Sequence, residues 1–305
     1  MSLRQFCGHR FDRITAQTTR SNKRALAAVI AALLCLAAGK AVAEDAARWR
    51  RQQWLIPSPE AKVEMRTAAL LPSGRGPFPL AVINHGTTEN EEERAQYPAP
   101  QFDVVASWLI AHGYAVVLPQ RPGHGETGGP YLESTESCDH ARYAEAGYGA
   151  ADSIQTAIDY ALRQPIAKQE RVLVVGNSAG AWGALALASR GANSIAGVIN
   201  FSGGLGGHSY GDANRNCAPD RLIDAAATYG RTAKAPTLWF YSANDSYFGP
   251  DLSERMADAF RSAGGRVDYR LLPPVGNEGH ALIYSRAAVR LWGPIVEKFL
   301  TTLRQ

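Results

Sequence analysis

The sequence predicts an α/β protein in which a mostly parallel, doubly wound sheet carries helices on both faces. From residue 80 to the end of the chain, short apolar runs rich in β-branched residues alternate with longer segments of helical pattern. Such alternation is typical of parallel strands joined by right-handed crossovers, with the connecting helices on the two faces of the sheet. No internal repeat or linker interrupts the pattern, so we expect residues 44–305 to form a single domain.

Seven segments have the pattern of strands. Most are apolar runs bounded by turn residues, as buried strands are. They cover residues 63–71, 80–83, 114–118, 172–175, 195–201, 237–241 and 267–272. Residues 46–60 hold two tryptophans and two prolines without alternation, and we expect an irregular segment there.

Six segments have the pattern of helices. Residues 102–111 place apolar side chains at i, i+3 and i+4, and a glycine follows at position 113. Gln164-Pro165 ends the expected helix at 144–163, and Gly264-Gly265 ends the one at 252–263. The expected helices cover residues 102–111, 144–163, 181–189, 219–229, 252–263 and 285–303. Residues 89–100 read as a polar loop.

The N-terminus resembles a targeting segment. A basic flank that ends at Arg24 precedes an uninterrupted apolar run over residues 25–38, and Ala41-Val42-Ala43 then supplies a small-x-small cleavage pattern. The run is shorter than the roughly 20 residues that a membrane span needs. A buried core helix is the alternative, but the run is uniformly apolar and precedes every strand. We therefore expect a signal peptide over residues 1–43, with an extended basic n-region, and a mature protein that is periplasmic or secreted and has no stable membrane span.

The charge distribution argues against nucleic acid as a partner. The net charge of +4 comes from residues 1–43, which hold seven basic residues and one acidic residue. The remainder holds 25 basic and 27 acidic residues, so the expected mature protein is close to neutral. The glycine-rich segment 119–130 has neither a Walker lysine-serine pair nor the G-x-G-x-x-G spacing of a dinucleotide site.

The central chemical motif is Gly176-Asn-Ser178-Ala-Gly180. It follows the strand at 172–175 and precedes the helix at 181–189, which is the context of a nucleophile elbow. Such a turn holds its serine at a strained backbone position with the hydroxyl exposed. Glycines flank the serine because a Cβ there would collide with neighbouring backbone. The helix N-terminus places N–H groups beside the serine oxygen.

Two further groups follow later strands. Asp245 comes after the strand at 237–241 and His280 after the strand at 267–272. The carboxyl ends of parallel strands meet at one edge of an open α/β sheet, where such proteins build their sites. Asp212 and Glu278 remain alternatives to Asp245, although neither comes directly after a predicted strand.

The chain resembles the α/β-hydrolase superfamily over residues 60–303, and within it the dienelactone-hydrolase-like and prolyl-oligopeptidase-like branch. The motifs that carry the resemblance are His85-Gly86, Arg121-Pro-Gly-His-Gly125, Gly176-x-Ser-x-Gly180, Asn244-Asp245 and Gly279-His280. The order Ser, Asp, His is that of the superfamily's triad. Dienelactone hydrolases have cysteine at the elbow, whereas this chain has serine. The chain has no room for the propeller of the peptidases, and we expect no large lid domain.

The resemblance and the chemistry assign roles to these residues. Ser178 is the expected nucleophile, His280 the base and later the acid, and Asp245 the group that orients His280. Backbone N–H groups of Thr87 and Ala179 form the expected oxyanion hole. His85 is expected to pack and hydrogen-bond beneath the site.

These roles predict an exported serine hydrolase that cleaves carboxylic esters of small molecules through an acyl-enzyme. A peptidase of the same fold and a non-catalytic binding protein remain alternatives, and the oligomeric state is open. No cofactor is expected, and no metal, because His124, His140 and His208 lack short ligand spacing. Three aromatic residues beside triad positions are candidate substrate contacts: Trp182, Tyr247 and Phe248.

Cys138 and Cys217 are the two cysteines that follow the expected signal peptide. An exported protein with two cysteines is a candidate for one disulfide, and two separate buried thiols are the alternative. Cys138 lies in the loop after the strand at 114–118, and Cys217 in the loop after the strand at 195–201. Because we expect these two strands to flank the elbow strand, their loops could meet above Ser178.

Overall fold

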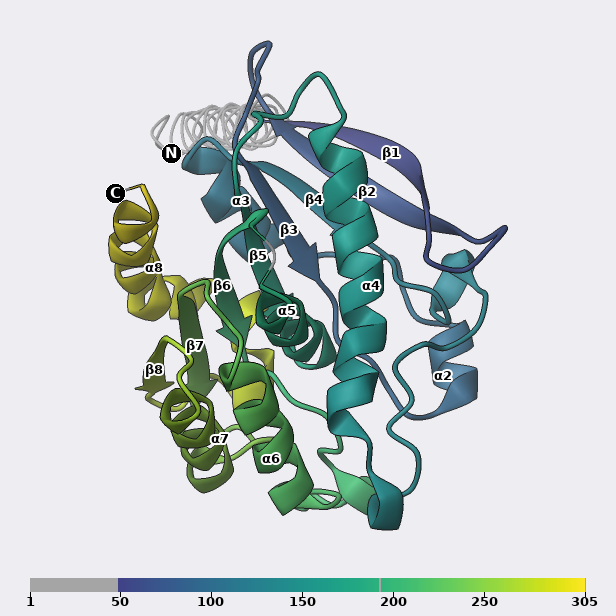
Figure 1. Ribbon diagram of the computed structural model, residues 1–305. Coiled ribbons are helices and arrows are strands. Elements are labelled where there is room, and N and C mark those ends of the chain that lie inside the picture. Colours follow the sequence, from purple (N-terminus) through teal and green to yellow (C-terminus); the bar gives the residue numbers. More distant parts are fainter. Residues whose placement is uncertain (1–48, 192, 305) are drawn as a thin grey trace, which may run out of the picture. The chain divides into compact units, whose positions relative to one another are not determined.

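The computed structural model describes residues 49–191 and 193–304. Residues 51–305 form one compact unit. In the described part of the chain, eight strands form one sheet in the order β1-β2-β4-β3-β5-β6-β7-β8 (Figure 1). The strands are β1 (Trp49–Pro57), β2 (Glu64–Pro72), β3 (Leu80–Asn84), β4 (Ala115–Pro119), β5 (Val172–Asn177), β6 (Ile195–Phe201), β7 (Thr237–Ser242) and β8 (Val267–Leu272). The expected signal peptide lies outside the described residues.

The sheet confirms the predicted fold class. Strands β3 to β8 pair in parallel, and β2 pairs antiparallel with β4. The elbow strand β5 lies between β3 and β6. The expectation that β4 flanks β5 is therefore wrong, because β3 separates them. Within the described residues, the chain from residue 51 onward forms one compact unit without a separate lid domain.

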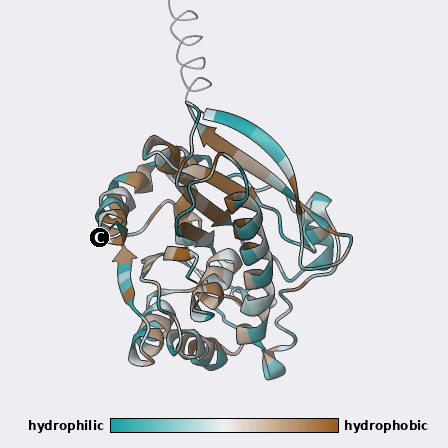
Figure 2. Cartoon of the chain, turned by 45° about the horizontal axis from the view of Figure 1, so that its top comes forward, coloured by the Kyte–Doolittle hydropathy of each residue, from teal (hydrophilic) through white to brown (hydrophobic). Residues whose placement is uncertain are grey.

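Residues 49–57 correct a second expectation. They form the outer strand β1 rather than an irregular segment. Only Ile56 is fully buried there, so the strand lacks the apolar alternation that would reveal it in the sequence. Trp54 instead packs against Tyr160, with ring centroids 5.8 Å apart. In Figure 2 most of β1 is hydrophilic, whereas the central strands are hydrophobic.

Helices cover both faces of the sheet. On one face α4, α5 and α6 pack together, where the Trp182 and Tyr229 rings meet at 5.1 Å. On the other face α3 and α8 meet through Trp108 and Trp292, with ring centroids 5.6 Å apart. The helices are α2 (Glu91–Ala95), α3 (Asp103–Ala111), α4 (Tyr143–Leu162), α5 (Ala179–Ser189), α6 (Pro219–Gly230), α7 (Pro250–Ser262) and α8 (Val289–Leu303). Helix α2 lies in the segment predicted as a polar loop, and the Asn90 side chain caps it. Within the described residues, no helix is both long and apolar enough to span a membrane.

Candidate active site

Ser178 occupies the sharp turn between β5 and α5. Its backbone has φ 53° and ψ −126°, a conformation that costs energy for any residue with a Cβ. Gly176 and Gly180 permit this turn. A Cβ at Gly176 would lie 2.4 Å from the Ala181 backbone. One at Gly180 would lie 2.4 Å from the carbonyl oxygens of Asn84, the last residue of β3, and His85, which follows it. The turn leaves Ser178 partly exposed at the wall of a cleft of about 990 Å³.

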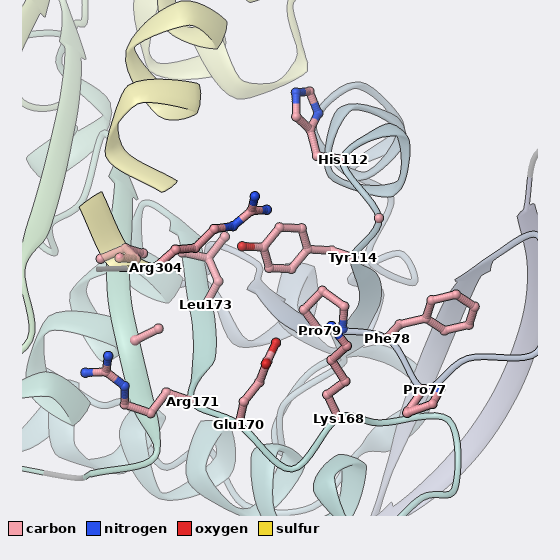
Figure 3. A pocket seen from close by; sticks show the side chains of 13 residues that line it. Pro77, Phe78, Pro79, His112, Tyr114, Lys168, Glu170, Arg171, Leu173 and Arg304 are labelled. Atoms are coloured by element: carbon pink, nitrogen blue, oxygen red, sulfur yellow. The ribbon is translucent and has the colours of Figure 1, made fainter. Parts of the chain in front are cut away.

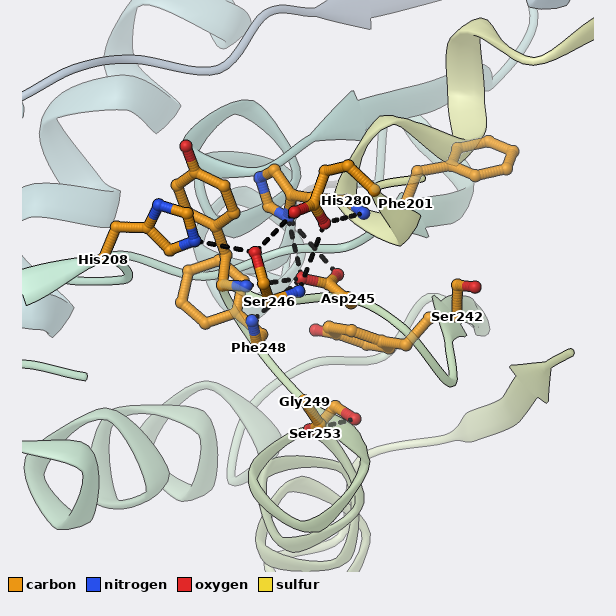
Figure 4. Close-up of polar contacts among 12 residues, drawn as sticks. Phe201, His208, Ser242, Asp245, Ser246, Phe248, Gly249, Ser253 and His280 are labelled. Atoms are coloured by element: carbon orange, nitrogen blue, oxygen red, sulfur yellow. Dashed lines mark hydrogen bonds and ion pairs between the residues drawn. The ribbon is translucent and has the colours of Figure 1, made fainter. Parts of the chain in front are cut away.

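Asp245 and His280 come together at the ends of β7 and β8 (Figure 4). The Nδ1 atom of His280 lies 3.2 Å from Oδ1 and 3.3 Å from Oδ2 of Asp245. Asp245 is 2% exposed, and its Oδ1 also accepts hydrogen bonds from the backbone N–H groups of Tyr247 and Phe248. The same carboxylate oxygen accepts from His280 Nδ1, so Nδ1 carries the ring proton in this contact and Nε2 is left available as a base.

The two alternative carboxylates are placed differently. Asp212 lies at the surface, where it pairs with Arg215 at 2.9 Å. Glu278 contacts the backbone N–H of His280 at 2.8 Å rather than its ring. Between Ser178 and His280, both of which the structure describes, no hydrogen bond is formed. Catalytic hydrogen bonds in unliganded sites often tighten only when substrate binds.

The loop after β3 passes directly over the elbow. A Cβ on Gly86 would lie 3.2 Å from the Ser178 Cβ, and Thr87 and Ala179 line the cleft beside Ser178. The Thr87 side chain is also held by a hydrogen bond to His124, which no local sequence pattern indicates. Burial lowers the pKa of His124, and its Nδ1 lies 3.1 Å from the Pro122 carbonyl. Nδ1 therefore donates, and Nε2 accepts from the Thr87 hydroxyl at 2.7 Å.

His85 lies beneath this loop. Its Nε2 accepts from the backbone N–H of Arg121 at 3.0 Å, and its Nδ1 lies 2.6 Å from the Gly86 carbonyl. Complete burial, and then the charge of Arg121, hold the pKa of His85 well below its ordinary value, so the ring is neutral and Nδ1 donates. His85 thus has the structural surroundings that the sequence suggested for it.

A buried ion pair supports His85 from below. The Arg121 guanidinium donates to the His85 carbonyl at 2.7 Å and forms a two-bonded pair with Glu133, at 2.5 and 2.8 Å. The two side chains are 0% and 2% exposed. Arg121 belongs to a motif noted in the sequence, but no local pattern marks Glu133, whose partner precedes it by 12 residues.

A disulfide crosses the cleft wall. Cys138 and Cys217 are bonded, with Cα atoms 5.1 Å apart, and both line the cleft with Ser178. The loops after β4 and β6 therefore meet even though β4 is two strands away from β5. The Tyr143 hydroxyl donates to the Cys217 carbonyl and holds this junction to α4.

Of the three aromatic candidates, two line the cleft. Tyr247 and Phe248 do so beside His280. The structure does not support a substrate contact for Trp182. Its side chain is 0% exposed, and its Nε1 donates to the Tyr143 carbonyl at 2.9 Å in the core between α4 and α5. Trp182 is the fourth residue of α5, and its direction from the helix sends it toward α4 rather than the cleft.

The charged side chains that line the cleft are acidic. They are Glu89, Glu93 and Glu136, and no lysine or arginine lines it among the described residues. Glu136 pairs with Arg142 at 3.2 Å. Glu93 accepts a hydrogen bond from the Thr88 hydroxyl at 2.7 Å. Desolvation raises the pKa of Glu89. The cleft is therefore least suited to an anionic substrate.

Two other hollows lie away from the elbow. One of about 730 Å³ adjoins the start of β5, where His112, Lys168, Arg171 and Arg304 line the hollow together with Tyr114 and Glu170 (Figure 3). The other, of about 450 Å³, lies between β8 and α8. Neither is lined by the elbow serine or by His280. Among the residues that the structure describes, no three His, Cys, Asp or Glu side chains could together hold a metal ion.

Comparisons with known proteins give a family and a fold. Residues 98–287 match the model of the dienelactone hydrolase family. No sequence among the curated proteins matches this chain.

Several solved structures resemble the chain. An acylaminoacyl peptidase of Pyrococcus horikoshii is 18% identical with a TM-score of 0.61, over 85% of this chain and 42% of its own. An esterase of Pyrococcus furiosus is 15% identical with a TM-score of 0.60, over 83% and 93%. A puromycin-hydrolyzing peptidase of Mycobacterium tuberculosis is 18% identical with a TM-score of 0.56, over 79% and 38%. The chain thus spans about two fifths of either peptidase, and these similarities establish a shared fold.

Proposed function

The chain belongs to the dienelactone hydrolase family, and we propose that it is an exported serine hydrolase that cleaves carboxylic esters through an acyl-enzyme. The observation that carries the proposal is the placement of Ser178 in a strained elbow at the N-terminus of α5, at the sheet edge that also holds the Asp245–His280 pair. A free serine hydroxyl is a weak nucleophile, and a histidine base oriented by a carboxylate activates it.

The proposed reaction has two halves. Ser178 Oγ attacks the ester carbonyl while His280 Nε2 takes its proton, and Asp245 stabilises the imidazolium. Backbone N–H groups of Thr87 and Ala179 donate to the oxyanion of the tetrahedral intermediate. Its collapse breaks the bond to the alcohol, which leaves with the proton from His280. Water then attacks the acyl-enzyme by the same route and releases the acid.

Two features support export. Residues 1–43 have the pattern of a signal peptide, and a disulfide such as Cys138–Cys217 persists in oxidising compartments. N-terminal sequencing of protein recovered from the periplasm or the medium is expected to begin near Glu44. A full-length N-terminus on protein that stays in the cytoplasm would contradict export.

Covalent labelling tests the chemistry. A fluorophosphonate is expected to add to Ser178, and peptide mapping by mass spectrometry identifies the labelled residue. A panel of p-nitrophenyl esters of graded acyl length then measures turnover and acyl preference. An active esterase labelled at another residue would overturn the assignment of Ser178, and a protein that neither labels nor hydrolyses would support a binding role.

A peptidase is the second candidate. The similarity to an acylaminoacyl peptidase fold supports it, although this chain spans only 42% of that protein. Matched p-nitrophenyl ester and p-nitroanilide substrates with the same acyl group separate the two activities. The ester proposal requires kcat/KM to be higher for the ester by more than the intrinsic difference in reactivity between the two leaving groups.

A further inference from the structure

A second carboxylate joins the Asp245 loop to the His280 loop. Oε1 of Glu278 accepts from the backbone N–H of His280 at 2.8 Å and from the backbone N–H of Ser246 at 3.2 Å. Its Oε2 accepts from the hydroxyl of Ser246. One side chain therefore holds the backbone next to both members of the Asp245–His280 pair.

The hydrogen-bond directions in this group are determined. Partial burial opposes ionisation of Glu278, but hydrogen bonds from Ser246 and His280 hold its pKa below the ordinary value. An ionised carboxylate can only accept, so the Ser246 hydroxyl donates to it. His208 Nε2 lies 2.7 Å from that hydroxyl oxygen and must donate to it. The bonds thus run from His208 through Ser246 to Glu278.

Stacked aromatic rings form a second connection between His208 and His280. The Tyr247 ring lies between His208, at 3.6 Å and 8°, and His280, at 4.2 Å and 24°. Asp245 holds the edge of the His280 ring, while Tyr247 supports one of its faces. His208 also lines the cleft. The brace, defined as Glu278, Ser246, Tyr247 and His208, therefore extends from the cleft wall to the imidazole.

We propose that Glu278 is a positioning residue that acts through this brace to hold His280 in line between Asp245 and Ser178. The inference rests on the proposed function, because it assigns Glu278 a part in the turnover that His280 would perform. Glu278 bonds to the backbone N–H of His280, while the ring Nδ1 bonds to Asp245, so Glu278 acts in addition to Asp245 rather than in its place. A small displacement of a catalytic group can cost a large factor in rate, whereas substrate affinity depends on other parts of the cleft.

Two substitutions test the brace. Glu278→Gln removes the charge and one acceptor, and Ser246→Ala removes the hydroxyl that links Glu278 to His208. Each is expected to lower kcat for a p-nitrophenyl ester roughly ten- to hundredfold and to leave KM within about twofold. The matched control is Glu297→Gln on the exposed side of α8, which is expected to retain wild-type kcat. Circular dichroism and thermal unfolding check that each variant is folded.

A spectroscopic measurement tests the brace independently of enzymatic turnover. In the Ser178→Ala background, proton NMR of ¹⁵N-histidine-labelled protein is expected to show the Nδ1 proton of His280 that Asp245 holds. Adding Glu278→Gln is expected to broaden or move that resonance, and adding Glu297→Gln to leave it unchanged. An unchanged resonance together with wild-type kcat in Glu278→Gln would overturn the proposal. If wild-type protein neither labels nor hydrolyses, the proposed function fails, and the resonance still reports on the brace.

Discussion

Oδ1 of Asp245 lies 3.2 Å from Nδ1 of His280 while it accepts hydrogen bonds from two backbone N–H groups of its own loop. The carboxylate is thus oriented before it meets the imidazole. Asp245→Asn is expected to lower kcat by a factor on the order of 10³ to 10⁴, because an amide can present its N–H and favour the wrong tautomer of His280. Steady-state kinetics measures this. Retention of most activity would mean that another carboxylate orients the histidine.

Ser178→Ala removes the proposed nucleophile and leaves the elbow backbone in place. Covalent labelling by a fluorophosphonate is expected to vanish, and ester turnover to fall by a factor on the order of 10³ or more. Because alanine also has a Cβ, the strained turn is retained and the melting temperature should stay close to that of the wild type. Full labelling of the variant would show that the nucleophile lies elsewhere.

The Cys138–Cys217 bond ties two cleft loops and lies outside the sheet. Its loss, in Cys138→Ser with Cys217→Ser, is expected to raise KM several-fold while the far-ultraviolet circular dichroism of the sheet persists. Dithiothreitol should have the same effect on the wild type and none on the double variant. Thiol titration of unreduced mature protein should find no free cysteine, and two free thiols would contradict the bond.

The carboxylates at the cleft predict selectivity for the charge of the ester. A neutral acyl group is expected to be preferred over a singly anionic one of similar size, and Glu89→Gln with Glu93→Gln should reduce that preference about threefold to tenfold, as expected for partly screened charges. The measurement is the ratio of kcat/KM values at low salt. The difference in this ratio between the wild type and the double variant should become smaller as the salt concentration is raised. A preference for the anionic ester in the wild type would contradict this account.

The buried pair of Arg121 and Glu133 predicts a large loss of stability when one partner is removed. Glu133→Gln leaves the Arg121 charge buried without its counter-ion and is expected to cost about 3–5 kcal/mol of unfolding free energy. Urea denaturation measures it. The control is Glu126→Gln, which breaks an exposed pair with Arg66 and should change stability by less than about 1 kcal/mol. Equal effects in the two variants would refute a special role for burial.

The sequence by itself determined the succession of the central strands and helices along the chain and the form of the elbow, but not which strand lies beside the elbow strand in the sheet. Runs such as residues 172–175 are apolar because both faces of the parallel sheet are covered, and the glycines beside Ser178 record close approaches of backbone that any side chain would prevent. Each of these constraints falls on a few consecutive residues, so the local sequence pattern reveals it.

Only the tertiary structure decided the remainder. Strand β1 lacks an apolar pattern because it is an outer strand, and Trp182 is buried because α5 turns that side chain toward α4. The Arg121–Glu133 pair joins two residues that lie 12 positions apart in the long connection between β4 and α4, and the bonds of Glu278 to Ser246 join the loops after β8 and β7. Which side chains pair in these interactions depends on how the loops are arranged in space. The energy of each pair depends on its burial, which no local pattern of residues encodes.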